Sequence, residues 1–291
     1  MTPPTLSVVV PAYNEEETVA ACLESLFAQI DEIDEIIVVD NNSTDDTERI
    51  VKEYAEKIDC LRLVHEPVQG ILAARSAGFG AATGDVIGRV DADSLVRPGW
   101  ARAIKRFLES DDSGAFGGVT GISIPYDSPF GGFKEHFVRG LMSLKMVGND
   151  MPIDNLAGAN MAIRKSTWTK VKGSVSTRSD VHEDVDLALT INDHGLKIAW
   201  LGDMWVDTSP RRRLTPPTEF TKYVRAGVET FALHGKATRQ VRYLVAPVTW
   251  GMHALTWLPY RAYDPELGRV SLRTLVRTKT GEVRSSPVRS V

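Results

Sequence analysis

Short apolar runs alternate with segments of helical periodicity over residues 6–90, and no other feature limits the fold of this chain as strongly. Strands that alternate with helices across short connections form a parallel sheet with helices on both faces. The predicted strands are 6–10, 35–39, 61–64 and 86–90. The predicted helices start after Asn14 and after residues 42–44, which we expect to act as N-caps, and at Ile71. The sequence therefore predicts an α/β fold.

Beyond residue 93 the regular alternation ends. Helical periodicity continues in 100–108, 182–194 and 219–233, and strand-like runs occupy 115–124, 157–163 and 197–201. The stretch 208–217 contains paired prolines and is expected to be a loop or hinge. One further helix carries an apolar stripe that we expect to pack in the core, with a groove for a lipid acceptor as the alternative. The stripe is formed by Phe130, Phe133, Phe137, Leu141 and Leu144.

The chain has 291 residues and a net charge of -4, so no basic field indicates nucleic acid as a partner. We expect a main domain over 1–235, with halves 1–114 and 115–235, and a tail over 236–291. The N-terminus lacks the pattern of a signal peptide, which predicts a cytoplasmic protein. Residues 243–260 lack charged side chains and precede a basic tail, so they form either a packed helix or a segment at a membrane surface.

Two aspartates, Asp91 and Asp93, follow the apolar strand 86–90 directly. In open α/β sheets, ligands bind in the crevice beyond the carboxyl ends of the strands. Two carboxylates on one turn can hold Mg²⁺ or Mn²⁺, and such ions usually share their coordination shell with substrate phosphates. These residues therefore indicate a site for a nucleoside diphosphate. The glycine fingerprint of dinucleotide-binding folds and the P-loop are both absent from the sequence.

Six segments in order resemble the motifs of the family 2 glycosyltransferases, which are inverting enzymes with the GT-A fold. The resemblance covers roughly residues 6–235, and the segments are 8–15, 36–47, 70–78, 91–93, 158–164 and 182–187. Ser76 stands where the family usually has Asn. The resemblance implies a Rossmann-like, mostly parallel sheet flanked by helices, with a nucleotide-binding half (1–114) and an acceptor-side half (115–235).

The resemblance also implies roles for individual residues. Asp93 and Asp91 would hold Mn²⁺ or Mg²⁺, with Asp91 also contacting ribose or sugar, and Asp184 would be the general base. In addition, Asp40 would accept a hydrogen bond from the nucleobase, and Arg75 would reach the base or the diphosphate. The remaining residues of the nucleoside pocket would be Pro11, Tyr13 and Glu15.

These roles predict a metal-dependent enzyme that moves one sugar from a nucleoside diphosphate sugar, with UDP favoured, to an acceptor. A nucleotide-sugar-binding protein without activity and a sugar-phosphate nucleotidyltransferase are the two alternatives. The acceptor is unknown, and the basic tail suggests a lipid-linked or cell-envelope acceptor at the cytoplasmic face of a membrane. One of Arg211, Arg212 and Arg213 is hypothesised to clamp the diphosphate, although a solvated basic loop explains them equally well.

Overall fold

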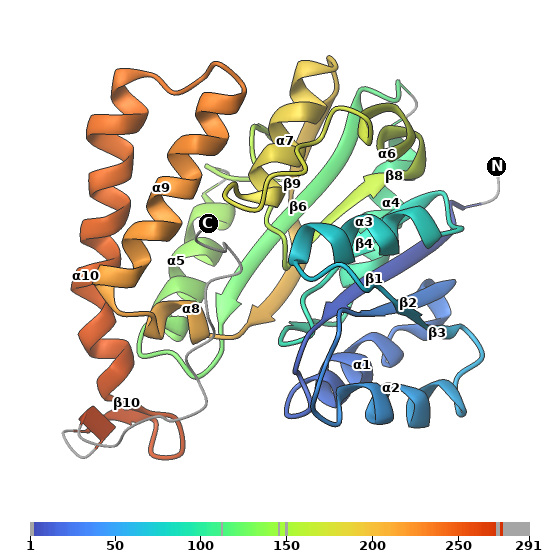
Figure 1. The fold of residues 1–291 in the computed structure, drawn as a ribbon, viewed down its shortest axis with the longest axis horizontal. Coiled ribbons are helices and arrows are strands. Elements are labelled where there is room, and N and C mark those ends of the chain that lie inside the picture. Colours follow the sequence, from blue (N-terminus) through green and yellow to red (C-terminus); the bar gives the residue numbers. More distant parts are fainter. Residues whose placement is uncertain (1–2, 112, 145, 149–150, 272–273, 276–291) are drawn as a thin grey trace.

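A single curved sheet forms the centre of the molecule in this computed structural model, and helices cover both of its faces (Figure 1). The structure describes residues 3–111, 113–144, 146–148, 151–271 and 274–275. Within these residues, nine strands pair in the order β3-β2-β1-β4-β8-β6-β9-β5, with β7 beside β9. The strands are β1 (Leu6–Ala12), β2 (Glu35–Asp40), β3 (Leu61–His65), β4 (Val86–Arg89), β5 (Leu95–Val96), β6 (Phe116–Pro125), β7 (Met151–Ile153), β8 (Met161–Arg164) and β9 (Lys197–Thr208).

Helices alternate with the strands along the chain. They are α1 (Val19–Phe27), α2 (Thr47–Ala55), α3 (Ile71–Ala81), α4 (Trp100–Ser110), α5 (Gly131–Ser143), α6 (Lys165–Val171), α7 (Glu183–Asp193), α8 (Arg211–Leu214), α9 (Pro217–Leu233) and α10 (Ala246–Ala262). A 3₁₀ turn (Ile30–Glu32) precedes β2, a π-helical turn (Val241–Val245) precedes α10, and β10 (Tyr263–Asp264) pairs with β11 (Arg269–Val270).

The first four strands are parallel, and β1 and β4 are fully buried, as the alternation predicts. Side chains of β1 point alternately to two cores. Leu6, Val8 and Val10 pack with α1, α2 and α4, whereas Val9 packs with α3, α6 and α7. Strands buried on both faces read as continuous apolar runs, which explains why the sequence located them.

Strand β8 is the point at which the parallel order is interrupted. It lies between β4 and β6 and is antiparallel to both, while β6 and β9 are parallel to each other. The sheet is therefore continuous across the predicted boundary between the two halves of the main domain. The mixed α/β architecture with a mostly parallel sheet agrees with the predicted fold class.

The predicted N-caps of the first two helices are wrong. Asn14 and Asn42 adopt left-handed backbone conformations, with φ of 52° and 64°, and the helices begin later, at Val19 and Thr47. The Asn14 side chain instead accepts a hydrogen bond from the Thr44 backbone N–H at 2.8 Å. Asn14 therefore joins the loop after β1 to the loop after β2, which is a tertiary contact that a local pattern does not reveal.

Two expectations about the second half also change. The residues 208–217 contain the one-turn helix α8 rather than only a loop. The apolar stripe on α5 does form on a helix, but it is not core, because Phe133 and Phe137 are 76% and 56% exposed. Within the described residues, no helix is long and apolar enough to cross a membrane. Several basic residues of the predicted tail, from Arg277 onward, lie outside the described residues.

Candidate active site

Asp91 and Asp93 lie in the turn that follows β4, at the carboxyl end of the central strands. Burial and the neighbouring Asp91 carboxylate raise the pKa of Asp93, because both disfavour its negative charge. A cation relieves this repulsion, so the pair has the charge and the oxygen ligands that a hard divalent ion requires. Arg211 is a cationic partner of this pair, with its Nε 3.8 Å from an Asp93 oxygen.

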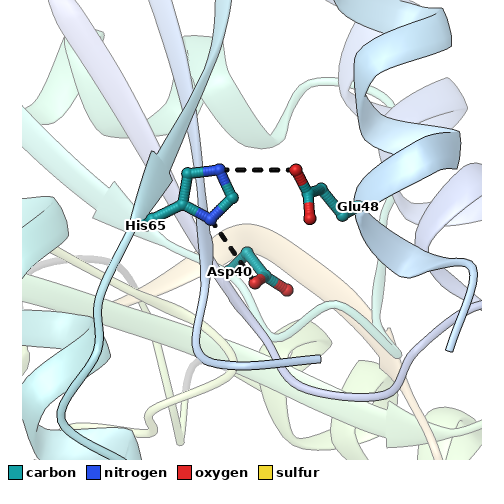
Figure 2. A group of neighbouring side chains, drawn as sticks. All are labelled: Asp40, Glu48 and His65. Atoms are coloured by element: carbon teal, nitrogen blue, oxygen red, sulfur yellow. Dashed lines mark ion pairs between the residues drawn. The ribbon is translucent and has the colours of Figure 1, made fainter. Parts of the chain in front are cut away.

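The end of β2 carries a second group of ionisable side chains, shown in Figure 2. Asp40 is buried, and the His65 ring lies between it and Glu48, with nitrogen-to-oxygen distances of 3.7 Å and 3.5 Å. The candidate ligand atoms of these three residues all lie within 4.8 Å of one another. The sequence identified Asp40, but His65 ends β3 and Glu48 lies on α2, so only the parallel register brings them together.

The residues at the end of β1 are divided between the interior and the surface. Pro11 and Glu15 are buried, while Tyr13 is 42% exposed. The Glu15 carboxylate accepts a hydrogen bond from Arg211 Nη2 at 2.9 Å. Arg211 thus contacts the loop after β1 and also approaches Asp93 after β4.

The general-base candidate Asp184 lies in the first turn of α7. Its Oδ2 accepts a hydrogen bond from the Gly158 N–H at 3.1 Å, which fixes the carboxylate against the loop before β8. Burial and the adjacent Glu183 raise the pKa of Asp184. A carboxylate whose negative charge is disfavoured in this way is a better proton acceptor than an ordinary aspartate.

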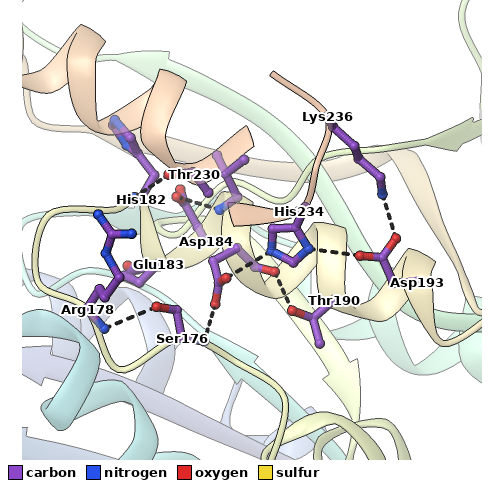
Figure 3. Close-up of polar contacts among 12 residues, drawn as sticks. Ser176, Arg178, His182, Glu183, Asp184, Thr190, Asp193, Thr230, His234 and Lys236 are labelled. Atoms are coloured by element: carbon purple, nitrogen blue, oxygen red, sulfur yellow. Dashed lines mark hydrogen bonds and ion pairs between the residues drawn. The ribbon is translucent and has the colours of Figure 1, made fainter. Parts of the chain in front are cut away.

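Asp186 lies on a different side of α7 from Asp184, as the helical spacing predicts. It is fully buried and pairs with His234 Nε2 at 3.0 Å. Figure 3 shows His234 at the end of α9 together with Asp193 and Lys236, which continue this network toward the surface. These contacts join α9 to α7, so the Asp186 carboxylate is already paired within the fold, and Asp184 stays the candidate for the general base.

Arg89, the last residue of β4, connects Asp91 to Glu183 at the start of α7. No pattern in the sequence indicated this role. Its Nη2 donates to Asp91 Oδ1 at 2.9 Å and its Nη1 donates to Glu183 Oε1 at 2.5 Å. A Cβ atom added at Gly158 would lie 3.1 Å from the Arg89 guanidinium nitrogens, so the backbone of Gly158 passes close to this group. In the sequence, the only indication of a role for Arg89 is that it lies two residues before Asp91.

Arg75 on α3, which the resemblance assigns to the base or the diphosphate, contacts the start of α7. Its side chain is fully buried, and Nη1 donates to the Glu183 carbonyl oxygen at 2.6 Å and lies 3.6 Å from the Glu183 carboxylate. Burial alone would raise the pKa of Glu183, but Arg89 and Arg75 outweigh that effect and lower it. Arg75 therefore lies against the start of α7, and its contact with a donor stays a prediction.

Helix α8 brings a second arginine to the site. The Arg212 guanidinium lies 4.5 Å from the centre of the Tyr223 ring, and Tyr223 packs edge-on against His182, the residue before Glu183. His182 Nε2 is 2.8 Å from the Tyr223 carbonyl oxygen. Arg211 thus faces Asp93, and Arg212 faces the start of α7. The run of three arginines in the sequence does not show that they face different parts of the site.

Comparison with known proteins agrees with this geometry. Residues 7–167, more than half of the chain, match the family described as glycosyl transferase family 2. EpsE of Bacillus subtilis, named as a putative glycosyltransferase, is 32% identical over 200 residues, which cover 67% of this chain and 69% of EpsE. Over other curated relatives the match is shorter, and the chain spans less than half of their length.

Two solved structures share the fold. A mannosyltransferase from Pyrobaculum calidifontis, in complex with GDP-mannose and Mn²⁺, has a TM-score of 0.63 and 23% identity, covering 94% of this chain and 78% of its own. Glucosyl-3-phosphoglycerate synthase from Mycobacterium tuberculosis, in complex with Mn²⁺, UDP and phosphoglyceric acid, has a TM-score of 0.55 and 20% identity, covering 81% and 80%. Both likenesses establish the GT-A fold.

Proposed function

Because the chain belongs to glycosyl transferase family 2 and is a glycosyltransferase, we propose that it transfers one sugar from a nucleoside diphosphate sugar with inversion of the anomeric carbon. One observation carries this proposal: Arg89 contacts both Asp91 and Glu183. The aspartates proposed to bind the donor and the helix that carries the proposed base are therefore joined by one side chain. Membership of this family favours sugar transfer over the two alternative functions, a binding protein without activity and a nucleotidyltransferase.

Asp93 and Asp91 would hold Mn²⁺ or Mg²⁺. The raised pKa of Asp93 supports this, because the pair has more negative charge than its surroundings neutralise. When bound, the metal would offset the charge that develops on the departing nucleoside diphosphate. Two protein carboxylates leave room in the coordination shell for phosphate oxygens, as such ions require.

The nucleoside would bind at the ends of β1 and β2. Tyr13 offers an exposed ring for the base, and Asp40 offers a buried acceptor for a base N–H. Pro11 and Glu15 would shape the pocket from behind. UDP is the favoured nucleotide, although both UDP and GDP-mannose occur among the structures that share the fold. Arg75 would position Glu183, and Arg211 would contact the diphosphate after leaving Asp93.

Asp184 would act as the general base. Its carboxylate would take the proton from the acceptor hydroxyl as that oxygen attacks the anomeric carbon, and its raised pKa makes it suited to this step. A single displacement without a protein nucleophile gives inversion. The contact from Gly158 and the buried arginines behind Glu183 would hold the carboxylate in place.

The acceptor would be carried on a lipid or a cell-envelope glycan, with the protein at the cytoplasmic face of the membrane. The exposed Phe133 and Phe137, which stack on each other on α5, support an apolar acceptor. Phe130 at the start of α5 contacts Tyr260 of α10, so the apolar surface of α5 adjoins the C-terminal helix.

Thermal unfolding with UDP, GDP, dTDP or ATP, each with Mn²⁺, Mg²⁺ or EDTA, tests the donor site. We expect one diphosphate to raise the midpoint in the presence of metal, and Asp93→Ala to abolish that rise. Stabilisation by ATP alone, or by no diphosphate, would contradict the proposal. The nucleotide identified in this way would then be used in a screen of sugars and acceptors.

A further inference from the structure

An apolar stripe runs along the outer side of α10 and of the π-helical turn before it. The residues are spaced by three or four positions, so they lie on one face. Each is more than half exposed: Leu244, Val248, Met252, Leu255 and Leu258, at 60%, 54%, 56%, 74% and 52%. Large apolar side chains gathered on one exposed helix face mark a surface that contacts another phase or partner.

The opposite side of the same helix is firmly attached to the protein. His253 Nε2 is 2.8 Å from the Thr215 carbonyl oxygen, and Trp257 Nε1 donates to the Leu214 carbonyl oxygen at 3.1 Å. Trp250 Nε1 donates to the Pro217 carbonyl oxygen at 2.9 Å. Figure 1 shows α10 at the edge of the molecule, beside α9. The exposure of the stripe is therefore a fixed property of the fold.

The chain segment that carries the stripe has charges of one sign. Between Glu229 and Asp264 the sequence contains four Lys and Arg residues and no Asp or Glu, although the whole chain has a net charge of -4. Arg239 and Arg242, just before the stripe, are exposed and make no ion pair with any residue in the described ranges. A surface of this kind is complementary to an anionic partner.

Two other occupants fit this surface poorly. A second copy of the chain would bring two basic faces together, which electrostatic repulsion opposes. Residues 276–291 contain four basic residues, one acid and no apolar residue larger than valine, so they have little with which to cover five exposed side chains. The helix is also too short and too polar to cross a bilayer.

We propose that this face of α10 lies on an anionic lipid bilayer, with the stripe in the headgroup region and Arg239 and Arg242 against the lipid phosphates. Apolar side chains flanked by basic ones bind such interfaces through hydrophobic burial and charge attraction together. This inference rests on the proposed function in one respect, because it names the surface by which the protein would contact the membrane. It does not depend on which donor the protein binds. Since α10 also holds α8, it connects the membrane to the helix that carries Arg211.

Flotation of the full chain with phosphatidylcholine vesicles, with and without phosphatidylglycerol, tests this inference. We expect the protein to float with the anionic vesicles and to be released by salt. Leu255→Asp should weaken binding by about tenfold or more because it places a charge in the stripe. Arg239→Glu with Arg242→Glu should weaken binding by roughly fivefold for each positive charge removed.

Val68→Asp is the matched control, because Val68 is 64% exposed but follows β3 at the other edge of the sheet, and it should float normally. Circular dichroism and the unfolding midpoint would establish that each variant is folded. Equal binding of Leu255→Asp and the parent would overturn the inference. A dimer in light scattering that Leu255→Asp abolishes would assign the face to a second copy instead.

Metal-dependent stabilisation by a nucleoside diphosphate would be measured on the same preparations. Donor binding without flotation would refute only the membrane surface. Flotation without donor binding would leave this surface intact and refute the proposed donor site.

Discussion

The central strands and the outer helices of the molecule bury their apolar residues to very different degrees. In β1 and β2, valine and isoleucine side chains are inaccessible on both faces of the sheet, whereas α5 and α10 carry phenylalanines and leucines that are more than half exposed. The strands are packed by partners within the chain. The difference shows that apolar periodicity predicts an element but not what covers it, and the sharpest tests compare the two regions directly.

The largest expected effect belongs to the chemical step. Asp184→Asn should lower kcat by about 10²–10⁴-fold, because a positioned base contributes a factor of that order. Donor binding should be unchanged, since Asp184 lies at the start of α7, whereas the proposed donor residues lie at the ends of β1 and β2 and after β4. A transfer assay and a donor titration would separate the two quantities. Loss of donor affinity equal to the loss of kcat would contradict this division of labour.

The pH dependence provides the control for this variant. The base acts only when ionised, so activity should fall with decreasing pH at a value above the ordinary aspartate pKa, because the pKa of Asp184 is raised. The same shift means that the folded protein loses stability as the pH rises through that pKa. Asp184→Asn should therefore be more stable than the parent at neutral pH. Its residual activity should lack the fall at low pH that the parent shows.

The next largest effect belongs to Arg89, which connects the acids after β4 to the start of α7. Arg89→Met should lower the free energy of unfolding by about 3–5 kcal/mol, because it leaves the buried Glu183 carboxylate without its closest partner. Urea denaturation would measure the change. By contrast, Arg102→Met removes a largely exposed arginine that pairs with Glu32, and should cost less than about 1 kcal/mol.

A double variant checks the cause. Arg89→Met combined with Glu183→Gln should be less destabilising than the two single changes added together, because both members of the pair are then neutral. Simple additivity would mean that the loss comes from packing against Gly158 and not from the unpaired charge.

Metal removal comes third. With metal present, a donor nucleotide at a hundred times its Kd should stabilise the protein by about 2.7 kcal/mol. Asp93→Ala or EDTA should remove that increment, whereas Asp184→Asn should retain it. Calorimetry of Mn²⁺ and nucleotide binding gives an independent measurement. Retention of the full increment in Asp93→Ala would place the metal elsewhere, and variants of Asp40, Glu48 and His65 would be tested next.

The smallest effects have opposite signs in the two regions. A Cβ at Gly78 on α3 would overlap Val9 of β1 and lie 2.9 Å from Val39, so Gly78→Ala should destabilise the protein by about 1–3 kcal/mol. Gly140 lies within α5 with nothing within 4 Å of an added Cβ, so Gly140→Ala should stabilise it by up to about 1 kcal/mol. Unfolding midpoints of both variants would check the contrast, and a loss in Gly140→Ala would indicate that α5 is covered.

The sequence predicts the fold well where burial is symmetric. Strands such as β1 and β4 are covered on both faces and leave continuous apolar runs that need no tertiary information. Asn14 was misassigned because its side chain bonds to a loop that begins nearly 30 residues later, a contact that competes with local capping. The α5 stripe was misassigned because an apolar face has the same spacing whether it is buried or exposed.

In the proposed site, the sequence indicates the acids but not the surroundings of the arginines. Asp91, Asp93 and Asp184 lie at element ends, where their types and positions carry the signal. The environment of Arg75 depends on α7, more than a hundred residues away, so its burial is not visible locally. The role of Arg89 depends equally on Glu183, and the distinction between Arg211 and Arg212 depends on the short helix α8.

The three hydrogen bonds from α10 to the backbone of residues 214–217 also decide where the chain can be shortened. The sequence predicts a catalytic domain over residues 1–235, yet a protein ending there would lack Trp250, His253 and Trp257. The carbonyl groups that these side chains bind would face water, and the one-turn helix with Arg211 would lose its outer support. The smallest fragment worth expressing therefore extends through Ala262, the last residue of α10.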